Sequence, residues 1–311
     1  MLESVLAEDD WRARAAAYRA RLDELVGPYL ERRAAGSTHP VIDFLFTYYG
    51  NKPAQLRRWH PGFGVGLAGA REYEGARGYH RDARPRQTGT PEWSGAPATD
   101  RGPVFAADPV YLARRRDTIE FVANLLRATA SRPAQLSCFG LHEWAMVYRT
   151  DDVRHRQVPL RLGSAGTDAV VEAMSLRCTH FDAFRFFTPE AVGRNAQPLA
   201  RADQVAREQP GCLHANMDLY KWSFKLVPLV SSELVLESFE LACAARELDM
   251  RASPYDLGAY GYTPIPIETP SGRAEYVRRQ AELAERAATL RATLLATCEK
   301  LLEAGAEHAV G

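Results

Sequence analysis

The chain has 311 residues, with 39 basic and 39 acidic side chains that leave no formal net charge, and 46% of its residues are hydrophobic. This balance excludes an intrinsically disordered protein, and the length suffices for one large core or two small ones. A neutral chain gives no electrostatic reason to expect nucleic acid or a membrane surface as a partner.

The apolar runs of the sequence are too short for a membrane span, which needs roughly 20 residues. One of the longest, residues 226–236, is interrupted by Pro228 and Glu233. The N-terminal segment MLESVLAEDDW carries acids where a secretory signal has basic residues and an apolar stretch. Five cysteines without a Cys-x-x-Cys pair argue against a disulfide framework. We therefore expect a cytoplasmic protein with reduced thiols and no membrane partner.

Helical periodicity begins near the N-terminus. Over residues 10–34, apolar side chains recur at steps of three and four, which predicts an amphipathic helix. Pro40 suits the first position of a second, buried helix that ends at Gly50.

Residues 52–107 contain nine glycines and six prolines and show no periodicity, which predicts a long irregular loop. Its first part has an excess of basic residues, with aromatic side chains such as Trp59 between the arginines. We expect either a lid over the functional site that binds an anionic or planar partner, or a solvated surface loop.

The rest of the chain is predicted to be helical, with few signs of strands and no internal repeat. Helices are expected over residues 109–131, 134–149, 167–176, 188–191, 212–226 and 233–250, and from 271 to near the C-terminus. Residues 177–187 fit either a strand or a helix. The predicted fold is therefore mainly α, with residues 1–311 forming a single helical domain.

Four of the eight histidines lie near carboxylates in apolar segments. The pairs are His39 with Asp43, His142 with Glu143, His180 with Asp182, and His214 with Asp218. Two of the pairs have the i,i+4 spacing that places both side chains on one helix face, toward one metal ion or substrate. The four histidines are therefore candidate metal ligands, and the alternative is a set of buried structural histidines. Cysteines 138, 178 and 212 lie within four residues of three of them, which leaves thiolate ligation open.

The segment 214–225 places His214, Asp218, Lys221 and Lys225 on one helical stripe, flanked by Tyr220 and Trp222. The chain has only four lysines, and two of them are here. A lysine among aromatic side chains can act as a base or nucleophile. The alternative is an ordinary Asp–Lys ion pair on a helix surface.

The segment HFDAFRFFTPEA surrounds Asp182 with aromatic residues, including Phe181, and with Arg185. Ring walls that stack on a base, beside a carboxylate that directs water, suit hydrolysis of a glycosidic bond to a purine. A core strand with an Asp182–Arg185 ion pair is the alternative. The sequence has no phosphate-binding glycine loop, dinucleotide fingerprint or serine-nucleophile elbow, which disfavours the corresponding enzyme classes.

Four segments, HPVIDFLFTYYGNKPAQLRRWHPGFG, CFGLHEWAMVYR, HFDAFRFFTPEA and CLHANMDLYKWSFKLVPL, carry a resemblance over roughly residues 10–300. In these segments the chain resembles a family of actinobacterial proteins catalogued as 3-methyladenine DNA glycosylases. The resemblance implies a DNA-repair hydrolase that cleaves the N-glycosidic bond of an alkylated purine and requires no cofactor. Its partner would be DNA or a purine-containing small molecule.

In such an enzyme the candidate catalytic residues are Asp182, Asp218, Lys221 and Glu143. The candidate substrate-binding residues are Trp59, Phe181, Arg185, Tyr220 and Trp222.

Two alternatives remain open at this point. The first is a metal-dependent enzyme with one or two ions of iron, manganese or zinc, bound by histidine and carboxylate and acting on a small molecule. The second is a catalytically inert binding protein with neutralised His–acid pairs in its core. For the glycosylase and for the metal-dependent enzyme alike, we expect seven side chains to converge on one pocket: His142, Glu143, His180, Asp182, His214, Asp218 and Lys221.

Overall fold

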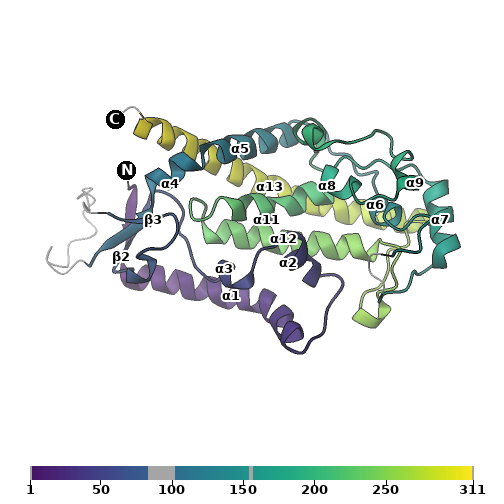
Figure 1. Cartoon of the computed structure of the whole chain (residues 1–311), viewed down its shortest axis with the longest axis horizontal. Helices are drawn as coiled ribbons and strands as arrows, with labels where there is room; N and C mark the ends of the chain where they lie inside the picture. The colour runs from purple at the N-terminus through teal and green to yellow at the C-terminus, as the bar shows by residue number, and fades with distance from the viewer. Residues whose placement is uncertain (1, 83–101, 154–156, 310–311) are drawn as a thin grey trace.

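The computed structural model of the chain describes residues 2–82, 102–153 and 157–309. It is 58% helical, which confirms the prediction of a mainly α fold. Long helices run along the long axis, and a small sheet lies at the end where both termini are found (Figure 1). Among the described residues, no helix combines the length and the hydropathy that crossing a membrane would require.

Five long helices build the core. They are α1 (Glu8–Ala34), α5 (Arg116–Ala130), α11 (Leu213–Lys225), α12 (Ser232–Arg251) and α13 (Pro270–Ala309). Helix α12 packs against α1, α11 and α13, and α13 also packs against α5 and α11. Because α12 is covered on several sides, it buries polar and charged residues as well as apolar ones.

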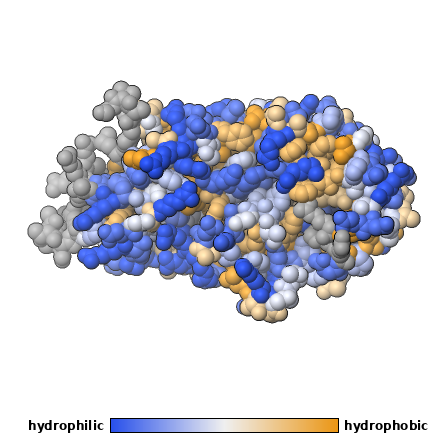
Figure 2. All heavy atoms as spheres, viewed as in Figure 1, coloured by the Kyte–Doolittle hydropathy of each residue, from blue (hydrophilic) through white to orange (hydrophobic). Residues whose placement is uncertain are grey.

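The apolar stripes predicted from the sequence form the buried faces of the outer helices. Helix α1 buries Trp11, Tyr18 and Leu22, among others, at the predicted spacing. Helix α5 buries Ile119 and Leu126 in the same way, and the opposite faces stay exposed. Figure 2 shows the result on one face of the molecule, where hydrophilic residues predominate and hydrophobic ones form small patches.

Short helices connect the long ones. They are α2 (Asp43–Tyr48), α3 (Pro53–Leu56), α4 (Pro109–Arg114), α6 (Leu141–Ala145), α7 (Gly163–Ala173), α8 (Phe181–Phe184), α9 (Pro189–Val192) and α10 (Gln204–Arg207), with 3-10 turns η1 (Arg71–Tyr73), η3 (Arg201–Asp203) and η4 (Gly258–Tyr260). The predicted helix over 109–131 is two helices that meet at Arg115. The helix predicted over 134–149 is reduced to α6, because Phe139 and Gly140 adopt left-handed backbone with φ of 51° and 71°.

The sheet was not predicted. It consists of β1 (Ser4–Leu6), β2 (Val65–Ala68), β3 (Tyr79–Asp82) and β4 (Val104–Ala107), in the order β1-β2-β4-β3. Only β1 and β2 are parallel. The prediction of an irregular loop over 52–107 is therefore wrong where α3, η1 and the strands form, while 83–101 lie outside the described residues. The strands escape a search for alternation because each has at most four residues and β4 is buried throughout.

Helix α12 begins with a side-chain cap. The hydroxyl of Ser231 accepts a hydrogen bond from the backbone N–H of Leu234, at 3.3 Å. We expect Ser231→Ala to lower the free energy of unfolding by about 1 kcal/mol, because one N–H of the first turn loses its acceptor. Urea denaturation would measure this, with Ser231→Asp as the control that keeps a capping oxygen. An alanine variant as stable as the parent protein would contradict the assignment.

Candidate metal centre

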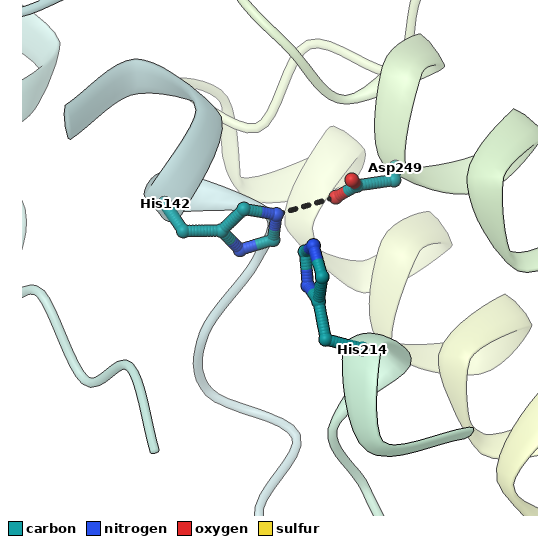
Figure 3. Close-up of side chains that lie close together, drawn as sticks. All are labelled: His142, His214 and Asp249. Atoms are coloured by element: carbon teal, nitrogen blue, oxygen red, sulfur yellow. Dashed lines mark ion pairs between the residues drawn. The ribbon is translucent and has the colours of Figure 1, made fainter. Parts of the chain in front are cut away.

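Three ligand-type side chains from three helices meet inside the bundle: His142 on α6, His214 on α11 and Asp249 on α12. Nε2 of His142 lies 2.8 Å from Oδ1 of Asp249, and the two imidazole rings are 4.5 Å apart between centroids. Figure 3 shows the two rings and the carboxylate pointing toward one another. One ligand atom from each side chain lies within 4.8 Å of the other two, so a single ion can bind all three after small side-chain adjustments.

A second group lies beside the first and consists of His180, Glu208 and Asp218, each at most 2% exposed. Nε2 of His180 is 3.3 Å from Oε1 of Glu208 and 3.4 Å from Oδ2 of Asp218. These distances are those of ion pairs, yet neither ring nitrogen of His180 has an aligned hydrogen bond to any described residue. Buried polar atoms normally have such a bond, so this ring is placed as a ligand would be.

The two groups form one continuous cluster. The rings of His180 and His214 are 5.4 Å apart between centroids. His214 and Asp218 belong to different groups but lie one turn apart on α11. We call these six residues the His/carboxylate cluster, and its two groups are close enough for a pair of neighbouring ions.

Two glycines allow the chain to reach these positions. Gly140 has a left-handed backbone, and a Cβ there would come within 3.3 Å of the Ala252 side chain. This turn starts α6 and brings His142 into the bundle. Gly211 approaches Gln135 so closely that a Cβ would lie 2.6 Å from its carbonyl oxygen, and α11 starts two residues later. A side chain at this position would therefore force apart the start of α11, which carries His214, and the segment at Gln135.

Hydrogen bonds hold the carboxylates of the second group. Tyr49 donates its hydroxyl to Oδ1 of Asp218 at 3.1 Å, and Gln204 donates its amide to Oε1 of Glu208 at 2.7 Å. In metal sites, contacts of this kind fix the orientation of the ligands and tune their basicity.

The cysteines lie next to the first group, and neither group contains one. Sγ of Cys138 is 3.6 Å from Nδ1 of His142, which leaves Nε2 of that ring facing Asp249. Cys178 and Cys212 line a pocket together with His142. Burial raises the pKa of both thiols, which keeps them neutral. The thiolate ligation left open by the sequence therefore has no support among the described residues.

Cationic side chains border both ligand groups. Lys221 is shared by Asp218 and Asp182, at 2.9 and 3.1 Å, and Arg246 is shared by Glu143 and Asp249, at 2.7 and 3.3 Å. A buried carboxylate without a full counter-charge favours any cation, whether a proton or a metal ion, that can reach it.

The histidine pKa values follow from burial and from the neighbouring charges. Burial lowers the pKa of His142, but the charge of the adjacent Asp249 carboxylate outweighs burial and raises it well above its usual value. Burial is likewise outweighed at His180, whose pKa is raised by Asp218 and Glu208. At His214 burial and the charge of His142 lower the pKa well below its usual value. A metal ion binds an unprotonated ring nitrogen, so metal binding at His142 and His180 competes with the proton that these shifts favour.

A pocket reaches the cluster at His214. Its lining includes Glu143, Asp182 and Arg246. Of the seven residues expected in one pocket, only Glu143, Asp182 and His214 line this one. His142, His180 and Asp218 belong to the cluster, and Lys221 links Asp182 to Asp218. Asp182 also pairs with Arg201 at 2.9 Å.

His39 and Trp59 lie elsewhere. Nδ1 of His39 accepts the backbone N–H of Val41 at 3.3 Å, and the ring packs edge-on against Tyr260, so it belongs to neither ligand group. Trp59 donates to Glu233 in the first turn of α12, about 24 Å from Asp249 along that helix, given its rise per residue. The described part of residues 52–107 around Trp59 thus packs at the other end of α12 and does not lie over the cluster.

The remaining predicted substrate-binding residues have structural surroundings. Tyr220 packs in the core, Trp222 lies under the ammonium groups of two lysines, and the guanidinium of Arg201 covers Phe181. Arg185 pairs with Asp182 at 3.3 Å, the ion pair that the sequence allowed as an alternative, but the segment is the short helix α8 and not a core strand. Of the described residues that line the pocket at His214, none is one of the five predicted for substrate binding.

Glu208, Asp249, Arg246 and Tyr49 were missed by the sequence analysis. Arg246 and Asp249 have the i,i+3 spacing of a helical ion pair, but five other charged residues on α12 keep this spacing from singling them out: Glu233, Glu237, Glu240, Glu247 and Arg251. Glu208 follows a short helix and has no comparable pattern around it.

Comparison with protein-family models, with curated proteins and with solved structures gives no match to this chain. The function is therefore inferred from the geometry of the cluster.

Proposed function

We propose that this protein is a metal-dependent enzyme that acts on a small molecule. His142, His214 and Asp249 hold one ion, and His180, Glu208 and Asp218 hold a second. The observation that carries the proposal is the convergence of six buried ligand-type side chains from separate segments of the chain. A structural His–acid pair needs two partners, whereas each of these groups brings three together.

The donor set favours particular metals. Both groups offer only imidazole and carboxylate, which suits iron, manganese and zinc. Two histidines with one carboxylate form the combination used by mononuclear non-haem iron enzymes, and paired iron sites in helical bundles use similar ligands. Iron is therefore the metal we expect first. When bound, it would supply Lewis acidity or redox chemistry at open coordination positions.

The protein's own residues provide orientation and a route for protons. The ligands come mostly from packed helices. Cys138 contacts the ring of His142, and Tyr49 donates a hydrogen bond to Asp218, which helps to fix the orientation of these two ligands. The ammonium group of Lys221 connects Asp218 of the cluster to Asp182 at the pocket. This chain of charge-assisted hydrogen bonds can hold or pass a proton between a molecule in the pocket and the cluster.

Elemental analysis of protein purified without an affinity tag tests the proposal. We expect about two ions per chain, one for each ligand group, with iron or manganese ahead of zinc. Exhaustive chelation should remove the metal, and adding it back should restore the original content. Protein that takes up no metal under any of these conditions would rule out the metalloenzyme.

Cleavage of an N-glycosidic bond in alkylated DNA is the second candidate, favoured by one feature of the pocket. Asp182 shares its lining with the aromatic side chains of Phe44, Tyr48 and Phe186, which suits a carboxylate beside a stacked base. Release of free base from alkylated DNA by chelated protein, lost in Asp182→Asn, would support this candidate over the first. No release by either protein would leave the metalloenzyme as the better account.

A further inference from the structure

Arg246 is a buried cation at the border between the pocket and the His/carboxylate cluster. It lies on α12 one turn before Asp249 and is 1% exposed. Its Nη1 donates to Glu143 at 2.7 Å and to Asp249 at 3.3 Å. The ring of Phe44 lies 4.1 Å from the guanidinium carbon, so the guanidinium is fixed on one face as well as by its ion pairs.

The other two nitrogens of this guanidinium have no hydrogen-bond partner in the described part of the chain. Nε and Nη2 of Arg246 are buried and make no hydrogen bond to any described residue. These two N–H groups lie on the same edge of the planar group, the edge that binds a carboxylate through two parallel hydrogen bonds. Buried donors without acceptors cost free energy that a bound anion would return.

The pocket supplies the rest of a binding site. Arg246 lines it together with Tyr48, Met146 and Phe186, and His214 joins it to the cluster. The pocket as it stands has room for about one water molecule, so a larger molecule on Arg246 has to widen it. Such a molecule would then meet apolar and aromatic side chains, with a metal ligand beside it.

We infer that Arg246 anchors the carboxylate of a small organic acid with an apolar body, and that this class of molecule is the substrate of the cluster. The inference rests on the proposed function for the chemistry, but the anchoring site itself is formed by side chains alone. Binding of a carboxylate can therefore be tested with and without metal.

The test is calorimetric titration of metal-free protein with acetate and benzoate, and with benzamide as the neutral analogue of benzoate. We expect the acids to bind and benzoate to bind at least about tenfold more tightly than benzamide, because only the acid accepts two charge-assisted hydrogen bonds. Arg246→Met should weaken benzoate binding by about tenfold to a hundredfold. Arg246→Lys keeps the positive charge but lacks the edge with two donors. Its affinity for benzoate should lie between those of the parent protein and Arg246→Met.

The matched control is Arg161→Met. Arg161 is a partly buried arginine that pairs with Glu268 through both terminal nitrogens, and it is outside the pocket lining. This variant should bind benzoate like the parent protein, and circular dichroism should show that all the variants are folded.

Three results would overturn the inference: no binding of either acid, equal binding of benzoate and benzamide, or undiminished benzoate binding by folded Arg246→Lys and Arg246→Met. Binding that appears only with added metal and survives Arg246→Met assigns the carboxylate to the metal and also overturns it. Metal content is measured separately, so failure of the metal proposal would appear as an ion-free protein, whatever the titrations give.

Discussion

Replacing one histidine of a ligand group is expected to remove one metal ion and leave the other in place. His142→Ala should lose the ion of the first group, and His180→Ala that of the second, because each leaves only two ligands. Loss of an outer contact to a ligand already costs about tenfold to a hundredfold in affinity, and loss of a ligand should cost more. Elemental analysis after gel filtration would measure the loss, and the double variant should carry no metal.

Two other histidines serve as controls. His60 is also buried, at 6% exposed, but its Nδ1 pairs with the hydroxyl of Tyr79, outside both groups. His39 is half-buried and belongs to neither group. His60→Ala and His39→Ala should therefore keep both ions. Equal metal content in His142→Ala and His60→Ala would refute the assignment of the first group.

Trp144→Ala is expected to be strongly destabilising. The indole is fully buried, and its Nε1 donates to the carbonyl of Ala252, just beyond the end of α12, at 2.9 Å. A Trp→Ala change in a core costs about 3–5 kcal/mol through lost burial and the cavity left behind. For a chain of this size, that corresponds to a fall in Tm on the order of 10 °C, measurable by thermal denaturation.

Two further variants separate the contribution of the Trp144 hydrogen bond from that of its burial. Trp144→Phe keeps most of the buried ring and loses the hydrogen bond, which should cost about 1–3 kcal/mol. Phe121→Ala removes an aromatic side chain that is 40% exposed and should cost clearly less than Trp144→Ala. A Trp144→Ala protein no less stable than Phe121→Ala would show that this indole is not central to the packing of α6 on α12.

The residues missed at the site illustrate why sequence patterns locate some ligands and not others. His214 and Asp218 were candidates because their i,i+4 spacing places them on one face of a helix. Asp249 lies 35 residues beyond His214 on the neighbouring helix α12, and no local pattern links the two. Their proximity depends on the packing of α11 against α12.

The sequence by itself determined the mainly α character, the amphipathic faces of α1 and α5, and the histidines and acids available for chemistry, because these follow from periodicity and residue type. Only the tertiary structure decided that Glu208 and Asp249 join those histidines, that His39 and Trp59 lie elsewhere, and that short strands form a sheet. The physical reason is that ligand groups and strand pairs are non-local contacts. They arise where helices cross and chain segments meet, and turns such as Phe139–Gly140 determine which side chains reach those places.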